Sequence, residues 1–92
     1  AEDLPAVGST ACSAGKYARK HVPWVNFSNV PASVSVPFSA FPGPGNYASL
    51  PTVSMVIPNN DNNMHDGSIA QGDAWLNSRM SAYANWAKAN NS

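Results

Sequence analysis

The apolar and polar positions divide the chain into two unequal parts. Residues 1–49 hold most of the prolines and show no long periodic run, which indicates loops joined by short elements. Residues 50–89 are more regular: a short apolar run is followed by a polar loop, and then by a segment with helical spacing. This pattern predicts a strand over 50–57, a loop over 58–67 that carries polar candidates for a site, and a helix over 68–89.

The predicted strand runs from Leu50 to Ile57. It is rich in β-branched and apolar residues, it stops at Pro58, and its length suits a buried central strand. Pro51 falls at its beginning, where a proline does not interrupt the hydrogen-bonded ladder.

The predicted helix begins with a capping box. Ser68 is placed to accept a hydrogen bond from the amide of Gln71, whose side chain reaches back to the amide of Ser68. A stripe of apolar residues with helical spacing follows and is predicted to be buried; it consists of Ile69, Leu76, Met80, Tyr83 and Ala87. Trp75 and Trp86 lie beside this stripe, and we expect them to cover the edge of a core.

A short helix is also predicted in the first part, from Ser13 to His21. Ser13 is a favourable cap, and Pro23 disfavours helical geometry in the residue before it. The basic residues Lys16, Arg19 and Lys20 are then expected to form one solvated face. His21 would lie at the end of this helix.

Strand, loop and helix together form half of a βαβ unit, and open α/β sheets bind ligands beyond the carboxyl ends of their strands. The loop from Pro58 to Gly67 is in that position. It carries His65 and Asp66 just before a helix N-terminus, whose free amides favour an anion such as phosphate. The alternative is that its Asn and Asp residues only form turns and that His65 is a surface histidine. Local spacing leaves both interpretations open.

Composition narrows the partners. Five basic and five acidic residues give a net charge of zero, which argues against nucleic acid and anionic membranes as partners. No run approaches the roughly 20 apolar residues of a membrane span. The low charged fraction, 11%, and the many Asn, Ser, Ala and Pro residues favour a secreted or periplasmic protein. Cys12 has no partner cysteine in the chain, so it is either a buried thiol or half of a bridge whose partner lies elsewhere.

Several segments resemble the phosphoesterase family of secreted acid phosphatases and phospholipases C. The first comprises Pro58-Asn59, then Asn63-Met64-His65-Asp66-Gly67, then Gly72-Asp73-Ala74-Trp75-Leu76. The second is Tyr17 to Phe27, with its lysine-histidine and proline-tryptophan pairs. Further similarity covers Glu2 to Pro5 and Leu50 to Ile57. These matches follow the order of the family over nearly the whole chain.

The resemblance implies an α/β fold, namely part of an alkaline-phosphatase-like α/β/α sandwich with one buried strand and a long C-terminal helix in this chain. In that family a hydroxyl nucleophile near a divalent metal ion attacks phosphorus, and histidines contact the phosphate. His21 and His65 match those histidines, and each is expected to donate hydrogen bonds to phosphate or to move a proton. Asp66 is expected either to orient a histidine or to cap the helix. Val22 stands where many relatives have Asn or Asp, so no polar role is carried over there.

By the same resemblance, the nucleophile and the metal ligands lie outside these 92 residues. The chain is therefore expected to be a single incomplete domain of a phosphate-ester hydrolase that is inactive alone. Its expected partners are a phosphate-ester substrate and either the remainder of a parent chain or another subunit. The alternative is a non-catalytic binding or structural fragment that docks on another chain, because a lone strand leaves both of its edges unpaired.

Overall fold

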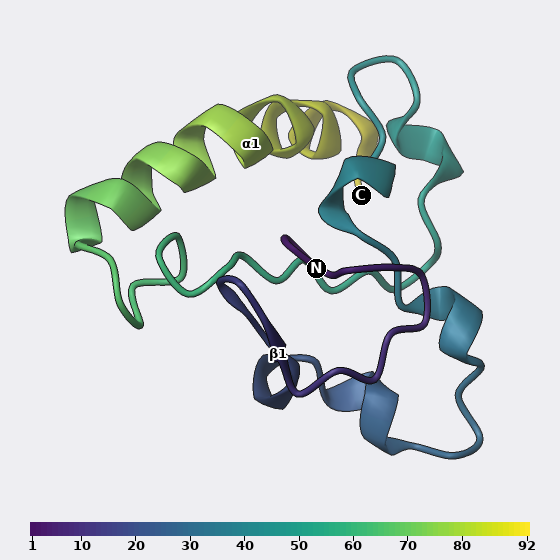
Figure 1. The fold of residues 1–92 in the computed structure, drawn as a ribbon. Coiled ribbons are helices and arrows are strands. Elements are labelled where there is room, and N and C mark those ends of the chain that lie inside the picture. The colour runs from purple at the N-terminus through teal and green to yellow at the C-terminus, as the bar shows by residue number, and fades with distance from the viewer.

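The computed structural model describes residues 1–92 and combines one long α-helix with a small antiparallel sheet (Figure 1). The sheet pairs β1 (Ser13–Ala14) with β2 (Tyr17–Ala18), and the helix α1 covers Ile69–Asn90. Five short 3-10 helices lie between them, η1 (Arg19–His21), η2 (Pro23–Asn26), η3 (Ala32–Val34), η4 (Phe38–Ala40) and η5 (Tyr47–Ser49). The molecule is flat, with extents of 37 × 34 × 17 Å. None of its helices has the length and apolar character that crossing a membrane requires.

The ends of α1 follow from local chemistry. The hydroxyl of Ser68 accepts a hydrogen bond from the amide of Gln71 at 3.1 Å, which satisfies one of the free amides of the first turn. At the other end, Asn91 adopts the left-handed conformation with φ of 55°, which ends the helix. The helix lies close to the range 68–89 that the sequence predicts.

The buried face of α1 differs from the predicted stripe. Ile69 and Leu76 are 78% and 57% exposed, so the prediction that they are buried is wrong for this chain. Met80, Tyr83 and Ala87 of the predicted stripe are half-buried, and the buried residues of the helix are Gly72 and Trp75. The helix has apolar residues on two overlapping faces. The aromatic rings of the loops pack against the face that carries Trp75 and Trp86. Phe38, for example, contacts Trp75, with ring centroids 5.4 Å apart.

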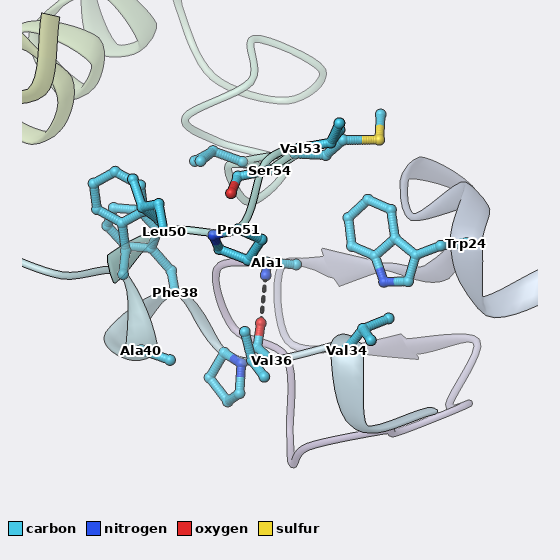
Figure 2. Close-up of a pocket in the computed structure, with 14 residues that line it drawn as sticks. Ala1, Trp24, Val34, Val36, Phe38, Ala40, Leu50, Pro51, Val53 and Ser54 are labelled. Atoms are coloured by element: carbon cyan, nitrogen blue, oxygen red, sulfur yellow. Dashed lines mark hydrogen bonds between the residues drawn. The ribbon is translucent and has the colours of Figure 1, made fainter. Parts of the chain in front are cut away.

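Residues 50–57 do not form the buried strand that the sequence predicts. Val53 is 78% exposed, and the residues from Pro51 to Val56 make no hydrogen bonds of a ladder. A strand requires a hydrogen-bonded neighbour, and this chain supplies only the amide of Glu2, which donates to the carbonyl of Ile57 at 2.9 Å. The segment instead lines an apolar cavity of about 460 Å³ together with Trp24, Val34 and residues around Phe38 (Figure 2).

The helix predicted over 13–21 is also wrong. Residues Ser13–Ala18 form a hairpin, in which Ala14 pairs with Tyr17, and only Arg19–His21 is helical. Gly15 explains the difference, because its φ of 55° allows a tight turn that most residues disfavour. The hairpin buries Tyr17, which a solvated helical turn would not.

A small core forms beside this hairpin. Leu4, Tyr17 and Val22 are buried in contact with one another, and Ile57 packs against them. Val22 is fully buried, which gives a physical reason for an apolar residue directly after His21. Only seven of the 92 residues are buried. Much of the chain's apolar surface therefore lies at the exterior of this structure.

Candidate functional site

The loop from Pro58 to Gly67 is closed by its own side chains. The Oδ1 atom of Asn59 accepts hydrogen bonds from the amides of Asp61 and Asn62 at 3.1 and 3.0 Å, the arrangement by which Asn stabilises a turn. The carbonyl of Asn59 also accepts from the amide of Asn63 at 2.8 Å. Gly67 completes the closure, because a Cβ atom at this position would overlap the carbonyl oxygen of Asp61.

Glu2 holds this loop against α1. Its carboxylate accepts three hydrogen bonds, from the amide of Asn59 at 2.9 Å, from Nδ2 of Asn62 at 2.9 Å and from Nε1 of Trp75 at 3.1 Å. Burial acts to raise the pKa of Glu2, but these three donors and the charge of Arg79 outweigh it and lower the pKa below its ordinary value of 4.5. Sequence reasoning missed this role, since only the family resemblance touched Glu2.

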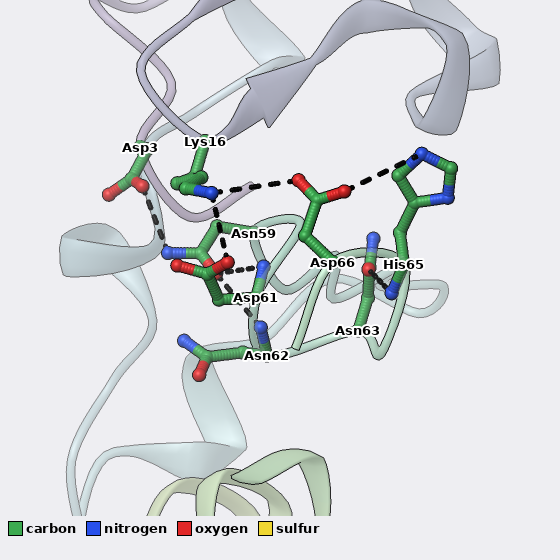
Figure 3. A network of polar contacts seen from close by, with 8 residues as sticks. All are labelled: Asp3, Lys16, Asn59, Asp61, Asn62, Asn63, His65 and Asp66. Carbon is green, nitrogen blue, oxygen red and sulfur yellow. Dashed lines mark hydrogen bonds and ion pairs between the residues drawn. The ribbon is translucent and has the colours of Figure 1, made fainter. Parts of the chain in front are cut away.

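The turn of the β1–β2 hairpin lies against the other side of the loop. The carbonyl of Lys16 accepts from the amide of Asn60 at 2.8 Å. The ammonium group of Lys16 lies 3.1 Å from Oδ1 of Asp61 and 3.6 Å from Oδ2 of Asp66 (Figure 3). The hydrogen bond and the charge of Asp61 raise the pKa of Lys16. Lys16 is exposed, as the sequence predicts, and it also lies at the edge of the site region.

The imidazole rings of the two candidate histidines, His21 and His65, lie next to each other. His21 ends η1 and His65 belongs to the loop, yet their ring centroids lie 5.9 Å apart with the ring planes at 73°. Asn63 contacts both residues: its Nδ2 lies 3.3 Å from Nδ1 of His21, and its Oδ1 accepts from the backbone amide of His65 at 2.8 Å. His21 is half-buried and His65 is exposed, so solvent reaches the pair.

Asp66 lies beside His65 rather than at the helix cap. Ser68 fills the cap position, and Oδ1 of Asp66 lies 4.0 Å from Nε2 of His65. That distance is too long for a direct hydrogen bond but short enough for an ion pair when the imidazole is protonated. Figure 3 shows the Asp66 carboxylate between Lys16 and His65.

This arrangement suits an anion. Two neighbouring imidazoles present N–H groups that can donate to different oxygens of one phosphate group. The charge of Lys16 is matched by the carboxylates of Asp61 and Asp66 and adds no free cation to the site. A metal ion does not fit the residues present, because no three His, Cys, Asp or Glu side chains gather in the structure. We therefore assign no residue of this chain to a metal. Cys12 is exposed and unpaired, so the expectation of a buried thiol is wrong.

Comparison with known proteins agrees with the motifs. The model of the family described as "Phosphoesterase family" matches residues 1–92. Over all 92 residues the chain is 84% identical to a protein of Mycobacterium tuberculosis (strain ATCC 25618 / H37Rv) described as a phosphatidylinositol-3-phosphatase, and it spans 31% of that protein's length. No solved structure matches the chain. The family resemblance predicted from the motifs is thereby confirmed, and the chain belongs to the phosphoesterase family.

Proposed function

We propose that this chain forms the phosphate-contacting part of the active site of a phosphate-ester hydrolase. The proposal rests on the proximity of His21 and His65, which belong to separate segments of a phosphoesterase family member. Their ring centroids lie 5.9 Å apart. A purely structural loop has no need to bring two solvent-accessible imidazoles together.

In this proposal both histidines donate hydrogen bonds to phosphate oxygens and stabilise the charge that develops during transfer. His65 also exchanges a proton with the ester or with water, since its exposure leaves it free to do so. Asp66 orients His65 through the 4.0 Å contact. Lys16 holds Asp66 and Asp61, and so keeps the loop in place.

The substrate that we propose for the parent protein, the longer protein to which these residues would belong, is a phosphatidylinositol phosphorylated at the 3-position. The support is the 84% identity with a protein described as a phosphatidylinositol-3-phosphatase. A phosphatase releases inorganic phosphate, whereas a phospholipase C releases a phosphorylated headgroup and leaves diacylglycerol. The description of this relative favours the phosphatase over the phospholipase C alternative that the family resemblance also allows.

We also propose that the parent protein has the alkaline-phosphatase-like α/β/α sandwich, in which other residues cover the segment 50–57. The exposed apolar side chains of Val53 and Met55 support this, because they have no cover within these residues. The hydroxyl nucleophile and the divalent metal ion that the resemblance implies would then be held by residues outside this chain. The isolated 92 residues should accordingly be inactive.

The experiment compares the parent protein with two variants on a short-chain phosphatidylinositol 3-phosphate. The parent should release inorganic phosphate, and His65→Ala should lower kcat on the order of 10²-fold by losing a transition-state contact. Lys20→Ala, which alters an exposed side chain next to His21, should leave kcat unchanged. Release of diacylglycerol instead of phosphate would contradict the phosphatase assignment. Unchanged kinetics of His65→Ala would remove this residue from the site, and normal turnover by the isolated chain would show that no essential group is missing.

The second candidate is a non-catalytic fragment that docks on another chain. It is favoured by the exposed apolar residues Val53, Ile69 and Leu76 and by the apolar cavity in Figure 2. The intact mass of the natural protein separates the two candidates. A mass well above 9.7 kDa supports the parent hydrolase, and a mass of 9.7 kDa with a tightly bound partner chain supports the fragment.

A secreted or periplasmic location is part of the proposal, on the basis of the low charged fraction of 11%. Fractionation of the source cells tests it. Activity confined to the cytoplasmic fraction would contradict it.

A further inference from the structure

We propose that Asn63 is a positioning residue that fixes the tautomer of His21, with the proton on Nε2. The assignment of the tautomer rests on geometry alone. Its catalytic meaning rests on the proposed function, in which His21 donates a hydrogen bond to the phosphate group.

The two ends of the Asn63 side-chain amide face different histidines. The backbone N–H of His65 can only donate, and it lies 2.8 Å from one end of the Asn63 side chain. That end must therefore be the carbonyl oxygen Oδ1. The orientation of the amide group is thus set by chemistry and does not depend on distinguishing oxygen from nitrogen by position.

The other end of Asn63 must be the NH2 group, which donates and cannot accept, and it lies 3.3 Å from Nδ1 of His21. Nδ1 of His21 must then be the acceptor. A neutral imidazole has one acceptor nitrogen and one donor nitrogen, so the proton of neutral His21 lies on Nε2.

The backbone of the loop keeps Asn63 in this position. Met64 adopts the left-handed conformation with φ of 70°, and this turn places the amide of His65 within reach of the preceding side chain. The amide of Asn63 itself donates to the carbonyl of Asn59 at 2.8 Å. Asn63 is therefore held at its backbone and at its oxygen, and its NH2 group is left to direct His21.

The tautomer of His21 determines what its Nε2 atom presents to a phosphate oxygen. With the proton on Nε2, His21 presents a hydrogen-bond donor to an anionic phosphate oxygen. In the other tautomer the Nε2 lone pair would face that oxygen and repel it. One asparagine thus contacts the backbone of one histidine and sets the protonation pattern of the other, which links the two groups proposed to bind phosphate.

The test is nitrogen NMR of the imidazole rings in the parent protein labelled at histidine, above the titration range of the rings. Wild-type His21 should show the Nε2–H tautomer. In Asn63→Asp one carboxylate oxygen still accepts from the His65 amide, while the other faces Nδ1 of His21 and can only accept. His21 should therefore switch to the Nδ1–H tautomer. Asn77→Asp, the same change at an exposed position of α1, should leave the tautomer unchanged.

The turnover of Asn63→Asp tests the proposed function separately from the tautomer. Asn63→Asp should lower kcat on the order of 10²-fold, because a wrongly placed proton removes a hydrogen-bond donor from the transition state. An Nδ1–H tautomer in the wild type would overturn the assignment, whether or not the variant folds, and so would an unchanged tautomer in Asn63→Asp. A switched tautomer with unchanged kcat would confirm the positioning of His21 but contradict its proposed role toward phosphate.

Discussion

The imidazole rings of His21 and His65 lie 5.9 Å apart although they belong to separate segments, a short 3-10 helix and the loop before α1. Asn63 joins the two segments through its side-chain amide. A ligand the size of phosphate can contact both rings at this spacing, which predicts that the two histidines act as a unit.

A double-mutant cycle tests this dependence in the parent protein. His21→Ala and His65→Ala should each lower kcat on the order of 10²-fold, and the double variant should lose less than the product of the two effects, because each ring depends on the other to hold the same phosphate. Turnover of a phosphate ester is the measurement. Effects that multiply fully would show that the rings act independently.

The closure of the loop predicts that Gly67 tolerates no side chain. Gly67→Ala would place a Cβ atom against the carbonyl oxygen of Asp61, and the free energy of unfolding should fall by about 1–3 kcal/mol, the usual range for overpacking. Gly43→Ala is the matched control, because a Cβ atom there meets nothing within 4 Å. Urea unfolding of both variants measures the difference. Equal stability of the two variants would contradict the closed loop.

The lowered pKa of Glu2 predicts a loss of stability in acid. Because the pKa of Glu2 is lower in the folded state, its stabilising effect is present above the ordinary value of 4.5 and is lost as the pH falls through the folded pKa. Glu2→Gln should therefore flatten the decline of unfolding free energy between about pH 5 and pH 3. Asp73→Asn removes an exposed carboxylate on α1 and serves as the control. Identical acid profiles for wild type and Glu2→Gln would exclude this role.

The unpaired hydroxyl of Tyr17 predicts that Tyr17→Phe does not lower the free energy of unfolding. The side chain is 2% exposed, its hydroxyl has no hydrogen-bond partner, and burial raises the pKa of the phenol. Tyr17→Phe removes an unsatisfied polar group, so the unfolding free energy should stay the same or rise by about 1 kcal/mol. Tyr17→Ala should lower it by about 3 kcal/mol through the cavity that it leaves. A loss of more than about 1 kcal/mol in Tyr17→Phe would show that the hydroxyl has a partner.

Local signals predicted the features of the fold that local chemistry controls. The cap at Ser68 and the helical spacing after it place α1 within a residue or two, because capping and periodicity act over a few neighbouring residues. The segment 50–57 depended on partners for pairing, and neither its burial nor its ladder could be deduced from its own composition. The buried face of α1 likewise depended on the aromatic loops that pack against it.

In the site too, the features set by neighbouring residues were predicted and those set by long-range contacts were not. The loop position and its two candidate residues, His65 and Asp66, were predicted from the pattern, and His21 came from the family resemblance. Their meeting could not be deduced from spacing, because it depends on how the hairpin folds onto the loop. Glu2, Lys16 and Asn63 act through long-range contacts, and no periodicity marks such contacts in a sequence.

Contact of both histidines with phosphate is tested most directly by titrating inorganic phosphate into the parent protein while following the imidazole resonances of His21 and His65 by NMR. Both rings should shift along one binding curve with the same Kd, and His65→Ala should weaken binding and move the shift of His21 to higher phosphate concentration. Saturation of the protein with phosphate while neither imidazole responds would contradict the proposed site.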